Sequence, residues 1–232
     1  MINLLNTIKR QIPLEFRDRH RQLWRNILCL TAIFISIILT RVFLGGRKYK
    51  ILKEDIKLNL GCGPVNLPGF VNVDIYPYKH VHAIRPVDNL KNLDNNSVSL
   101  IYASHVLEHF PIERIPRVLR EWHRVLASGG ILRISVPDFD KLLKIYVAAG
   151  NDSHIIERPL MGGQSNIFDY HKSLFNRRSL SCLLENAGFK IIKEWYLENF
   201  PELLNHQDSS MLEIAIGNQS YSISLNIEAV KA

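Results

Sequence analysis

Cysteine is scarce in this chain. The three cysteines, Cys29, Cys62 and Cys182, are odd in number, lie far apart and form no C-x-x-C pair. Neither a disulfide framework nor a cysteine-based metal site is therefore expected. This use of cysteine fits a reducing compartment, and we predict a cytoplasmic location.

An unbroken apolar run of membrane-spanning length is also lacking. Residues 27–40 (ILCLTAIFISIILT) are uncharged, and Arg41 separates them from the apolar residues 42–44. A transmembrane helix needs about 20 apolar residues. The segment 27–44 therefore has two interpretations. It is either a single membrane span, or a helix that lies on the inner membrane face or on its own domain.

Acidic residues are few at the front of the chain. Residues 1–55 hold 11 Lys and Arg but only four Asp and Glu, and the formal net charge of the whole chain is +7. A basic end suits an anionic membrane surface, nucleic acid or a phosphorylated partner, although a solvated helix face explains it equally well. We predict a basic helical extension over residues 1–50.

From residue 56 onward the apolar pattern is that of an α/β domain. It predicts helices at 111–126, 138–149 and 176–187, and strands at 57–60, 70–74, 83–87, 97–103, 131–136, 190–196 and 221–229. Helices that alternate with buried strands indicate a doubly wound, mostly parallel sheet covered on both faces. No helix separates the last two strands, so they are predicted to form an antiparallel edge.

A glycine turn follows the first predicted strand. Gly61-Cys62-Gly63 comes directly after KLNL, and the next strand ends on Asp74. Glycines let the backbone approach a ligand closely, and an acid at that strand end is placed to accept hydrogen bonds from ribose hydroxyls. A nicotinamide site is disfavoured, because the sixth position of G-x-G-x-x-G is Asn66.

A second motif spells H-x-x-E-H, the order of an inverted zinc-protease helix. It consists of His105, Glu108 and His109, and it follows an apolar strand directly. Phe110-Pro111 interrupts the chain just after it. A zinc site would need a helical context and a third ligand. We therefore predict no metal, and expect the motif to line a ligand pocket or to form a structural turn.

Together these segments resemble class I S-adenosylmethionine-dependent methyltransferases. LNLGCG is similar to the first motif of that family, VNVDI to its second strand, and VDNL with NNSVSLIYASHVLEHF to its third and fourth strands. REWHRVLASGGILRISVPD and HKSLFNRRSLSCLLENAGFKIIKEW resemble the elements that follow. The resemblance covers residues 56–232 approximately and implies a Rossmann-like fold with S-adenosyl-L-methionine as cofactor. It is closest to a branch of predicted methyltransferases that accompany glycan and polysaccharide assembly. Proteins of this branch carry a GGQ…DYHK segment, which is residues 162–172 here and is called the GGQ segment below.

The resemblance also implies roles for individual residues. Asp74 would bind the ribose, Ile75 would lie against the adenine, and Asp88 with Asn89 would face the adenine amino group. The methionine part of the cofactor would lie along Asn59, Gly61, Cys62, Gly63, Ser104 and His105. The chain departs from the family at Asn59, where an acid is usual, and at Val65, where a third glycine is expected.

The connection between the first two strands is unusually short. Ten residues separate Gly63 from Asp74, whereas a crossover between parallel strands usually takes a dozen or more. The first crossover helix must therefore be reduced to a loop around residues 64–69. One face of the cofactor site is then open or covered by another segment, such as the N-terminal helices or the GGQ segment.

Methyl transfer is an in-line displacement, so a base is needed only for a hydroxyl acceptor. The candidate bases are His105, His109 and His171. We favour His171, because it follows the GGQ segment at the carboxyl edge of the sheet, where ligands bind.

The favoured acceptor is an oxygen of a sugar, a glycolipid or another small molecule. Two alternatives remain. An RNA methyltransferase would fit the basic front end, but the catalytic part has no basic stripe with interleaved aromatics. A catalytically degenerate, membrane-associated binding protein would fit the departures at Asn59 and Val65.

Overall fold

The computed structural model describes residues 55–196, 200 and 208–232, and six helical positions near the N-terminus, namely Leu23, Asn26, Ile27, Leu30, Thr31 and Phe34. The helices are α4 (Ile115–Val125), α5 (Phe139–Ala148), α6 (His154–Met161) and α7 (Arg177–Asn186), with short 3-10 turns η1 (Leu107–His109) and η4 (Ser209–Met211). The strands are β1 (Lys57–Leu60), β2 (Val71–Asp74), β3 (Ala83–Ile84), β4 (Val98–Ser104), β5 (Leu126–Pro137), β6 (Phe189–Glu194), β7 (Glu213–Ile216), β8 (Gln219–Ser222) and β9 (Ser224–Lys231).

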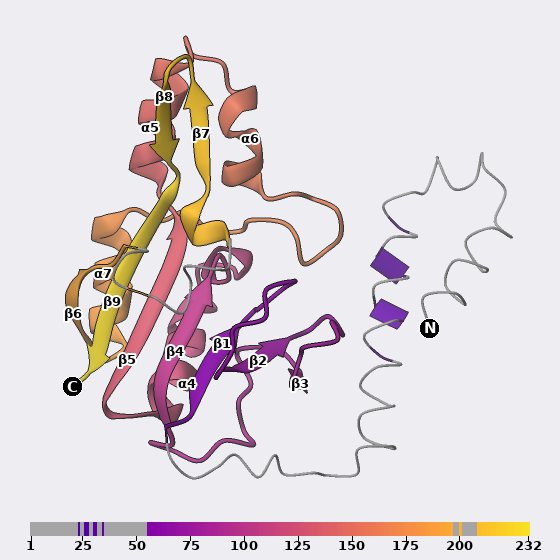
Figure 1. The fold of residues 1–232 in the computed structure, drawn as a ribbon, viewed down its shortest axis with the longest axis vertical. Coiled ribbons are helices and arrows are strands. Elements are labelled where there is room, and N and C mark those ends of the chain that lie inside the picture. The colour runs from indigo at the N-terminus through magenta and orange to yellow at the C-terminus, as the bar shows by residue number, and fades with distance from the viewer. Residues whose placement is uncertain are drawn as a thin grey trace, which may run out of the picture.

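The main sheet has the strand order β3-β2-β1-β4-β5-β9-β6 (Figure 1). The first five strands in this order run parallel, and β9 is antiparallel to both β5 and β6. The predicted α/β fold with a mostly parallel sheet and an antiparallel edge is confirmed. The carboxyl ends of β1, β2 and β4 meet at one edge, which is where open α/β sheets bind ligands.

Two predicted strands have different bounds, for reasons that lie in the backbone. The strand predicted at 83–87 ends at Ile84, because Pro86 has no N–H to continue the ladder. The strand predicted at 221–229 divides into β8 and β9 at Ile223. The N–H of Ile223 donates to the carbonyl of Leu212 and its carbonyl accepts from Asp138, so this residue leaves both ladders.

The predicted helix at 111–126 and the strand after it are also shifted. Residues 111–114 form a turn closed by a hydrogen bond from the N–H of Arg114 to the carbonyl of Pro111, and α4 begins at Ile115. The strand predicted from residue 131 begins at Leu126, which pairs with Val98 across an irregular register. The Ser128-Gly129-Gly130 turn therefore falls within β5.

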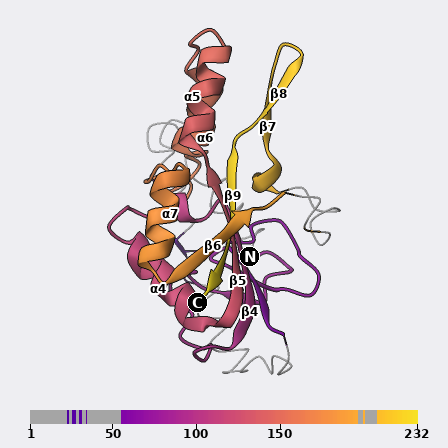
Figure 2. The same cartoon turned by 90° about the vertical axis from the view of Figure 1, so that its left-hand side faces the viewer.

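One face of the sheet is covered by α4 and α7, as Figure 2 shows. The apolar residues of α4 repeat at helical spacing, and Ile115, Val118, Leu119, Trp122 and Val125 are all buried in the main core. A capping box formed by Asn176 and Ser179 fixes the start of α7.

The opposite face of β4 is covered without a crossover helix. The connection between β1 and β2 contains no helix, and its residues Leu67 and Phe70 pack with Tyr102, Trp195 and Phe200. The guanidinium of Arg133 lies over the ring of Phe200, 4.2 Å from its centroid. The predicted loss of the first helix is thus confirmed, and aromatic residues that follow β6 fill its place.

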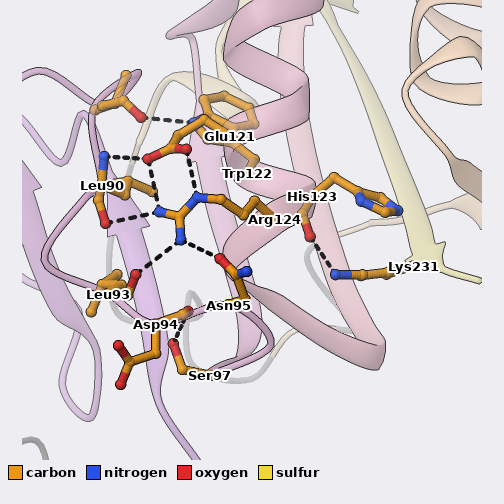
Figure 3. Close-up of polar contacts among 11 residues, drawn as sticks. Leu90, Leu93, Asp94, Asn95, Ser97, Glu121, Trp122, His123, Arg124 and Lys231 are labelled. Carbon is orange, nitrogen blue, oxygen red and sulfur yellow. Dashed lines mark hydrogen bonds and ion pairs between the residues drawn. The ribbon is translucent and has the colours of Figure 1, made fainter.

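An arginine of α4 holds the segment before β4 (Figure 3). Arg124 donates to the carbonyls of Leu90 and Leu93 at 3.1 and 3.0 Å and to the side chain of Asn95 at 2.7 Å. Its Nε donates to Glu121, whose other oxygen accepts from the N–H of Leu90 at 2.7 Å. This network fastens the segment before β4 to α4.

The helix α6 and the β7–β8 hairpin do not appear among the predicted elements. With α5 they project together beyond the end of the main sheet (Figure 1) and bury a separate apolar cluster that includes Leu142, Ile145, Ile156 and Ile223. Pro159 inside α6 weakens its helical signal, because proline removes a backbone donor.

The N-terminal extension, 1–50, and its apolar segment, 27–44, lie almost entirely outside the described residues. One described position there, Asn26, accepts a hydrogen bond from the N–H of Ile167 at 3.0 Å. Within the part of the chain that the structure describes, no helix combines the length and the apolar character needed to cross a membrane.

Candidate functional site

The glycine turn after β1 adopts a backbone that other residues disfavour. Gly61 and Gly63 have φ angles of 64° and 52°, in the left-handed region where a Cβ is strained. The N–H groups of Gly61 and Cys62 donate to the carbonyl of Val73 at 2.8 and 3.2 Å, which ties the turn to β2. A Cβ on Gly61 would lie 2.5 Å from Val106, whereas one on Gly63 would meet nothing within 4 Å.

Asp74 closes β2 beside this turn. One carboxylate oxygen accepts from the N–H of Gly63 at 2.8 Å, and the other accepts from the N–H of Tyr76 at 2.7 Å. Burial raises the pKa of Asp74 above its ordinary value, and these backbone donors partly offset that rise. Each oxygen keeps further acceptor capacity, so the carboxylate can bind ligand hydroxyls while it holds the turn.

Asn59 has a structural partner in the short connection. Its side-chain nitrogen donates to the oxygen of Asn72 at 2.9 Å, and the nitrogen of Asn72 donates to Asn66 at 2.8 Å. This chain of amides, buried at Asn59 and Asn72 and exposed at Asn66, fastens the loop that replaces the crossover helix. The departure from an acid at position 59 thus coincides with the shortened loop.

A cavity of about 400 Å³ lies along the glycine turn. The structure brings together here Asn59, Gly61, Cys62, Gly63, Ser104 and His105, all predicted from the sequence, with Pro64, Val65, Asp208, Ser209 and Leu212. The hydroxyl of Ser104 is buried and has no hydrogen-bond partner among the described residues. A cavity of this size suits a small molecule.

Asp88 and Asn89 line a different hollow, of about 260 Å³, on the side of α4. Arg114 donates to the Asp88 carboxylate at 2.5 Å, so the predicted adenine contact already carries an ion pair. Ile75 lies next to Asp74 and is half-buried. The predicted cofactor residues therefore form one compact group at the glycine turn and a second group at Asp88.

Aromatic residues just after β2 connect the turn to the GGQ segment. The hydroxyl of Tyr76 donates to Asn166 at 2.7 Å, and its ring meets Phe168 edge-on. The rings of Tyr78 and His80 stack with centroids 5.7 Å apart, and His80 contacts the carbonyl of Gly63 at 3.0 Å. The GGQ segment, one of the two covers predicted for the site, therefore reaches the ribose end of the turn.

His105 comes directly after β4 and has a φ of 52°, an unusual angle for a non-glycine residue. Its Nε2 lies 2.8 Å from the hydroxyl of Ser224, and its Nδ1 lies 3.3 Å from Oε1 of Glu108. Glu108 is 1% exposed, and neither of its carboxylate oxygens has a hydrogen-bond partner among the described residues. His105, in the cavity wall, is thus followed by a buried carboxyl group, Glu108, whose oxygens take part in no hydrogen bond among the described residues.

His171 and His109 complete this region from the other side. The Nε2 of His171 lies 3.9 Å from Oε1 of Glu108, and the rings of His109 and His171 meet edge-on with centroids 4.9 Å apart. The structure therefore brings all three predicted bases together around Glu108, although His171 lies 62 positions beyond His109 in the chain.

The pKa values of these groups favour their neutral forms. Burial raises the pKa of Glu108 to about 8. Burial lowers the pKa of His105 to about 3 and that of His171 to about 4, and the neighbouring histidines add to both shifts. Burial also lowers the pKa of His109. At neutral pH the three imidazoles are therefore uncharged.

The chain matches the model of the methyltransferase domain family over residues 60–194, more than half of its length. The chain belongs to this family. It is an S-adenosylmethionine-dependent methyltransferase with a Rossmann-like fold. The open space beside Gly63, the acceptor capacity of Asp74 and the unpartnered hydroxyl of Ser104 fit a bound nucleoside cofactor.

A solved methyltransferase shares this fold. A 1,6-didemethyltoxoflavin-N1-methyltransferase from Burkholderia thailandensis, with 1,6-didemethyltoxoflavin and S-adenosylhomocysteine bound, is 14% identical, with a TM-score of 0.50 over 94% of this chain and 85% of that one. A SAM-dependent methyltransferase from Methanosarcina mazei is 16% identical, with a TM-score of 0.48 over 77% of this chain and 93% of that one. No curated protein matches the chain.

The sequence did not point to Asp208 or Ser209 as parts of the methyltransferase site. They follow β6 and reach the cavity because Tyr102 and Ser210 hold Asp208 in place through hydrogen bonds. The only signal was the polar run NHQDSS, which is typical of a loop.

Cys62 of the methyltransferase is expected to resist alkylation. Burial, and then the charge of Asp74, raise the pKa of its thiol to about 12, so the reactive thiolate is about 1,000-fold rarer at pH 8 than for an ordinary thiol. Mass spectrometry of peptides after iodoacetamide treatment should show rapid modification of the exposed Cys182 and slow modification of Cys62. Equal rates at the two sites would contradict the burial of Cys62.

Proposed function

We propose that this methyltransferase transfers the methyl group of S-adenosylmethionine to a hydroxyl oxygen of a sugar, a glycolipid or a similar small metabolite used in glycan assembly. The observation that supports this acceptor class is the set of polar side chains that line the cavity together with the glycine turn. Ser104, His105, Asp208 and Ser209 place hydroxyl, imidazole and carboxylate groups there. Such groups both donate to and accept from hydroxyls, which suits a polyhydroxylated acceptor.

In the proposed reaction, the acceptor O–H bond breaks and a lone pair of that oxygen forms the new O–CH₃ bond. The bond between the methyl carbon and sulfur breaks, and its electron pair returns to sulfur, so the sulfonium becomes a neutral thioether. The chain's contribution is mainly to position the two reactants. The predicted role of His105 and His171 is to take up the acceptor proton directly or through water.

The charge of the catalytic domain supports a small acceptor over RNA. Residues 58–232 hold 17 Lys and Arg against 18 Asp and Glu, whereas proteins that bind the phosphate backbone are strongly basic on one face. The basic extension and residues 27–44 would instead bring the domain to the cytoplasmic membrane face, where lipid-linked acceptors lie.

The test is mass spectrometry of glycans and lipids from a strain that lacks the gene. The expected result is the loss of a CH₂ mass increment from one glycan or glycolipid, and its return with the intact gene but not with an Asp74→Ala variant. Purified chain should also bind S-adenosylmethionine at equilibrium. Folded protein that does not bind it would overturn the proposed methyl transfer to a hydroxyl and favour the catalytically degenerate alternative. A methyl group lost from RNA instead would overturn the acceptor class.

A further inference from the structure

The H-x-x-E-H motif and the GGQ…DYH segment converge on one cluster beside the cofactor cavity. Glu108, His109 and His171 each offer one ligand-capable atom, and these three atoms lie within 4.8 Å of one another. His105, which lines the cavity, touches the same carboxylate at 3.3 Å. The H-x-x-E-H motif has no third ligand of its own, and the fold brings His171 beside it.

The hydrogen bonds of His109 and His171 set which ring nitrogens are free. The Nδ1 of His109 lies 3.1 Å from the carbonyl of Tyr170, and the Nδ1 of His171 lies 3.0 Å from the carbonyl of Pro159. A carbonyl only accepts, so Nδ1 carries the hydrogen in both rings and each Nε2 keeps its lone pair. Histidines that bind metals are held in this way, with the far N–H donated to a carbonyl or a carboxylate.

The tautomer of His105 is set in a similar way. The hydroxyl of Ser224 donates to the carbonyl of Ser209 at 3.0 Å, so it accepts from Nε2–H of His105. The Nδ1 lone pair of His105 then faces Glu108. Three imidazole lone pairs and the carboxyl group of Glu108 thus meet in a buried space, where either the carboxyl proton or a bound cation must stabilise them.

The backbone holds this cluster rigidly. The N–H groups of Lys172 and Ser173 donate to the carbonyl of Glu108 at 2.7 and 3.2 Å, and the hydroxyl of Ser173 donates to the carbonyl of Phe110 at 2.7 Å. These bonds join the segment after α6 to the turn after β4. The cluster is therefore preorganised, as a binding site requires.

The glycine pair of the GGQ segment is needed for the same packing. A Cβ on Gly162 would lie 2.3 Å from the carbonyl oxygen of Asp169 and 2.9 Å from the backbone nitrogen of His171. A Cβ on Gly163 would lie 2.6 Å from the Asp169 carboxylate. The two glycines thus let the chain fold back closely enough to place His171 beside Glu108.

From this geometry we propose that Glu108, His109 and His171 bind one divalent transition-metal ion next to the methyl-transfer end of the cavity. Two imidazoles and one carboxylate are a donor set for Zn²⁺, Fe²⁺ or Mn²⁺. Ligands about 2.0–2.2 Å from Zn²⁺ lie about 3.3–3.6 Å apart in a tetrahedron, so the three groups need only a small contraction. Three protein ligands leave at least one position for another oxygen.

A second part of the inference rests on the proposed function. The remaining position on the ion would take the acceptor hydroxyl, since His105, which lines the cavity, lies 3.3 Å from the Glu108 carboxylate. Coordination to a divalent ion lowers the pKa of a bound hydroxyl, as it does for bound water, so the acceptor oxygen can lose its proton to water near neutral pH. His171 then acts as a ligand and not as a free base.

The first test is metal binding by the intact, chelator-treated chain. Titration with Co²⁺ should give the visible d–d absorption of a nitrogen and oxygen site and saturate at one ion per chain, and calorimetry with Zn²⁺ should give the same stoichiometry. Folded wild-type chain that binds neither Co²⁺, Zn²⁺ nor Mn²⁺ at one equivalent would overturn the proposal.

Matched variants locate the site. Glu108→Gln and His171→Gln are each expected to lower Co²⁺ affinity by about 100-fold or more, because each removes a ligand. His154→Gln is the control, since His154 and Glu157 form a similar His–Glu pair at 3.2 Å on the surface, where His154 is 86% exposed. Unchanged Co²⁺ affinity in the first two variants, or equal losses in all three, would overturn the assignment.

S-adenosylmethionine binding, measured on the same samples, separates this inference from the proposed function. Retained cofactor binding in Glu108→Gln shows that the variant is folded. If the wild type binds metal but not the cofactor, the proposed methyl transfer is overturned, whereas the proposed metal site is supported. Cofactor binding and methyl transfer that persist at full rate in chelator-treated, metal-free chain would overturn the catalytic part of the inference.

Discussion

Asp74→Asn is expected to lower the affinity of the chain for S-adenosylmethionine by about 100-fold or more. Hydrogen bonds to a charged group contribute about 1.5–3 kcal/mol each, and the assigned role of Asp74 is to accept two from the ribose. The amide keeps the shape of the carboxylate but replaces one acceptor oxygen with a donor. That donor would face the N–H of Gly63 or Tyr76, so the glycine turn also loses an anchor. Isothermal calorimetry measures the change.

Asp152→Asn is the matched control for Asp74. Asp152 also accepts a hydrogen bond from a backbone N–H, that of His154 at 3.0 Å, but in an exposed turn away from the cavity. Its amide variant is expected to bind the cofactor with wild-type affinity. Urea unfolding of both variants shows how much stability each loses. Cofactor affinity that stays at the wild-type value in folded Asp74→Asn would refute the ribose assignment.

The glycine turn and its acid were accessible from the sequence because their chemistry is local. Gly61 and Gly63 have positive φ angles, and glycine is the residue type that adopts such angles most readily. The short spacing from Gly63 to Asp74 leaves no room for a helix, and the hydrogen bond between these two residues follows once β1 and β2 pair in parallel. The mostly parallel sheet with an antiparallel edge followed from the same kind of local pattern.

The covering of the shortened crossover was not accessible in this way. Trp195 and Phe200 pack against Phe70 and Tyr102 across more than 90 positions of sequence. Their apolar character predicts that they are buried, but it does not predict which face of the sheet they cover. The amide chain that links Asn59, Asn72 and Asn66 has the same origin, since an isolated asparagine gives no sign of its partner.

The cluster around Glu108 shows the same limit at the functional site. The sequence displays H-x-x-E-H and, separately, DYH after GGQ, and it favours His171 as a base. It does not reveal that η1 and the segment after α6 are joined by hydrogen bonds from Lys172 and Ser173 to Glu108. That contact depends on α6, a helix that was not predicted because Pro159 weakens its helical signal in the sequence. A third ligand was therefore visible only in three dimensions.

Gly61→Ala is expected to destabilise the domain by about 2–5 kcal/mol. Part of this, about 1–2 kcal/mol, comes from placing a Cβ in the left-handed region at φ 64°. The remainder, about 1–3 kcal/mol, comes from overpacking, because the new Cβ would lie 2.5 Å from Cγ2 of Val106. Val106 is buried and β-branched, so its side chain has little freedom to move aside. Urea unfolding gives the free energy.

Two companion variants separate the backbone strain from the clash. Gly217→Ala has a similar φ of 58° but a Cβ that meets nothing within 4 Å, so it should cost only the backbone part, about 1–2 kcal/mol. In a Val106→Ala background the clash is gone, and Gly61→Ala should there cost no more than Gly217→Ala does in the wild type. A double-mutant cycle measures this coupling. If Gly61→Ala lowers the free energy of unfolding equally in both backgrounds, Val106 does not restrict the glycine turn. The close approach of the turn to the residues after β4 would then depend on other contacts.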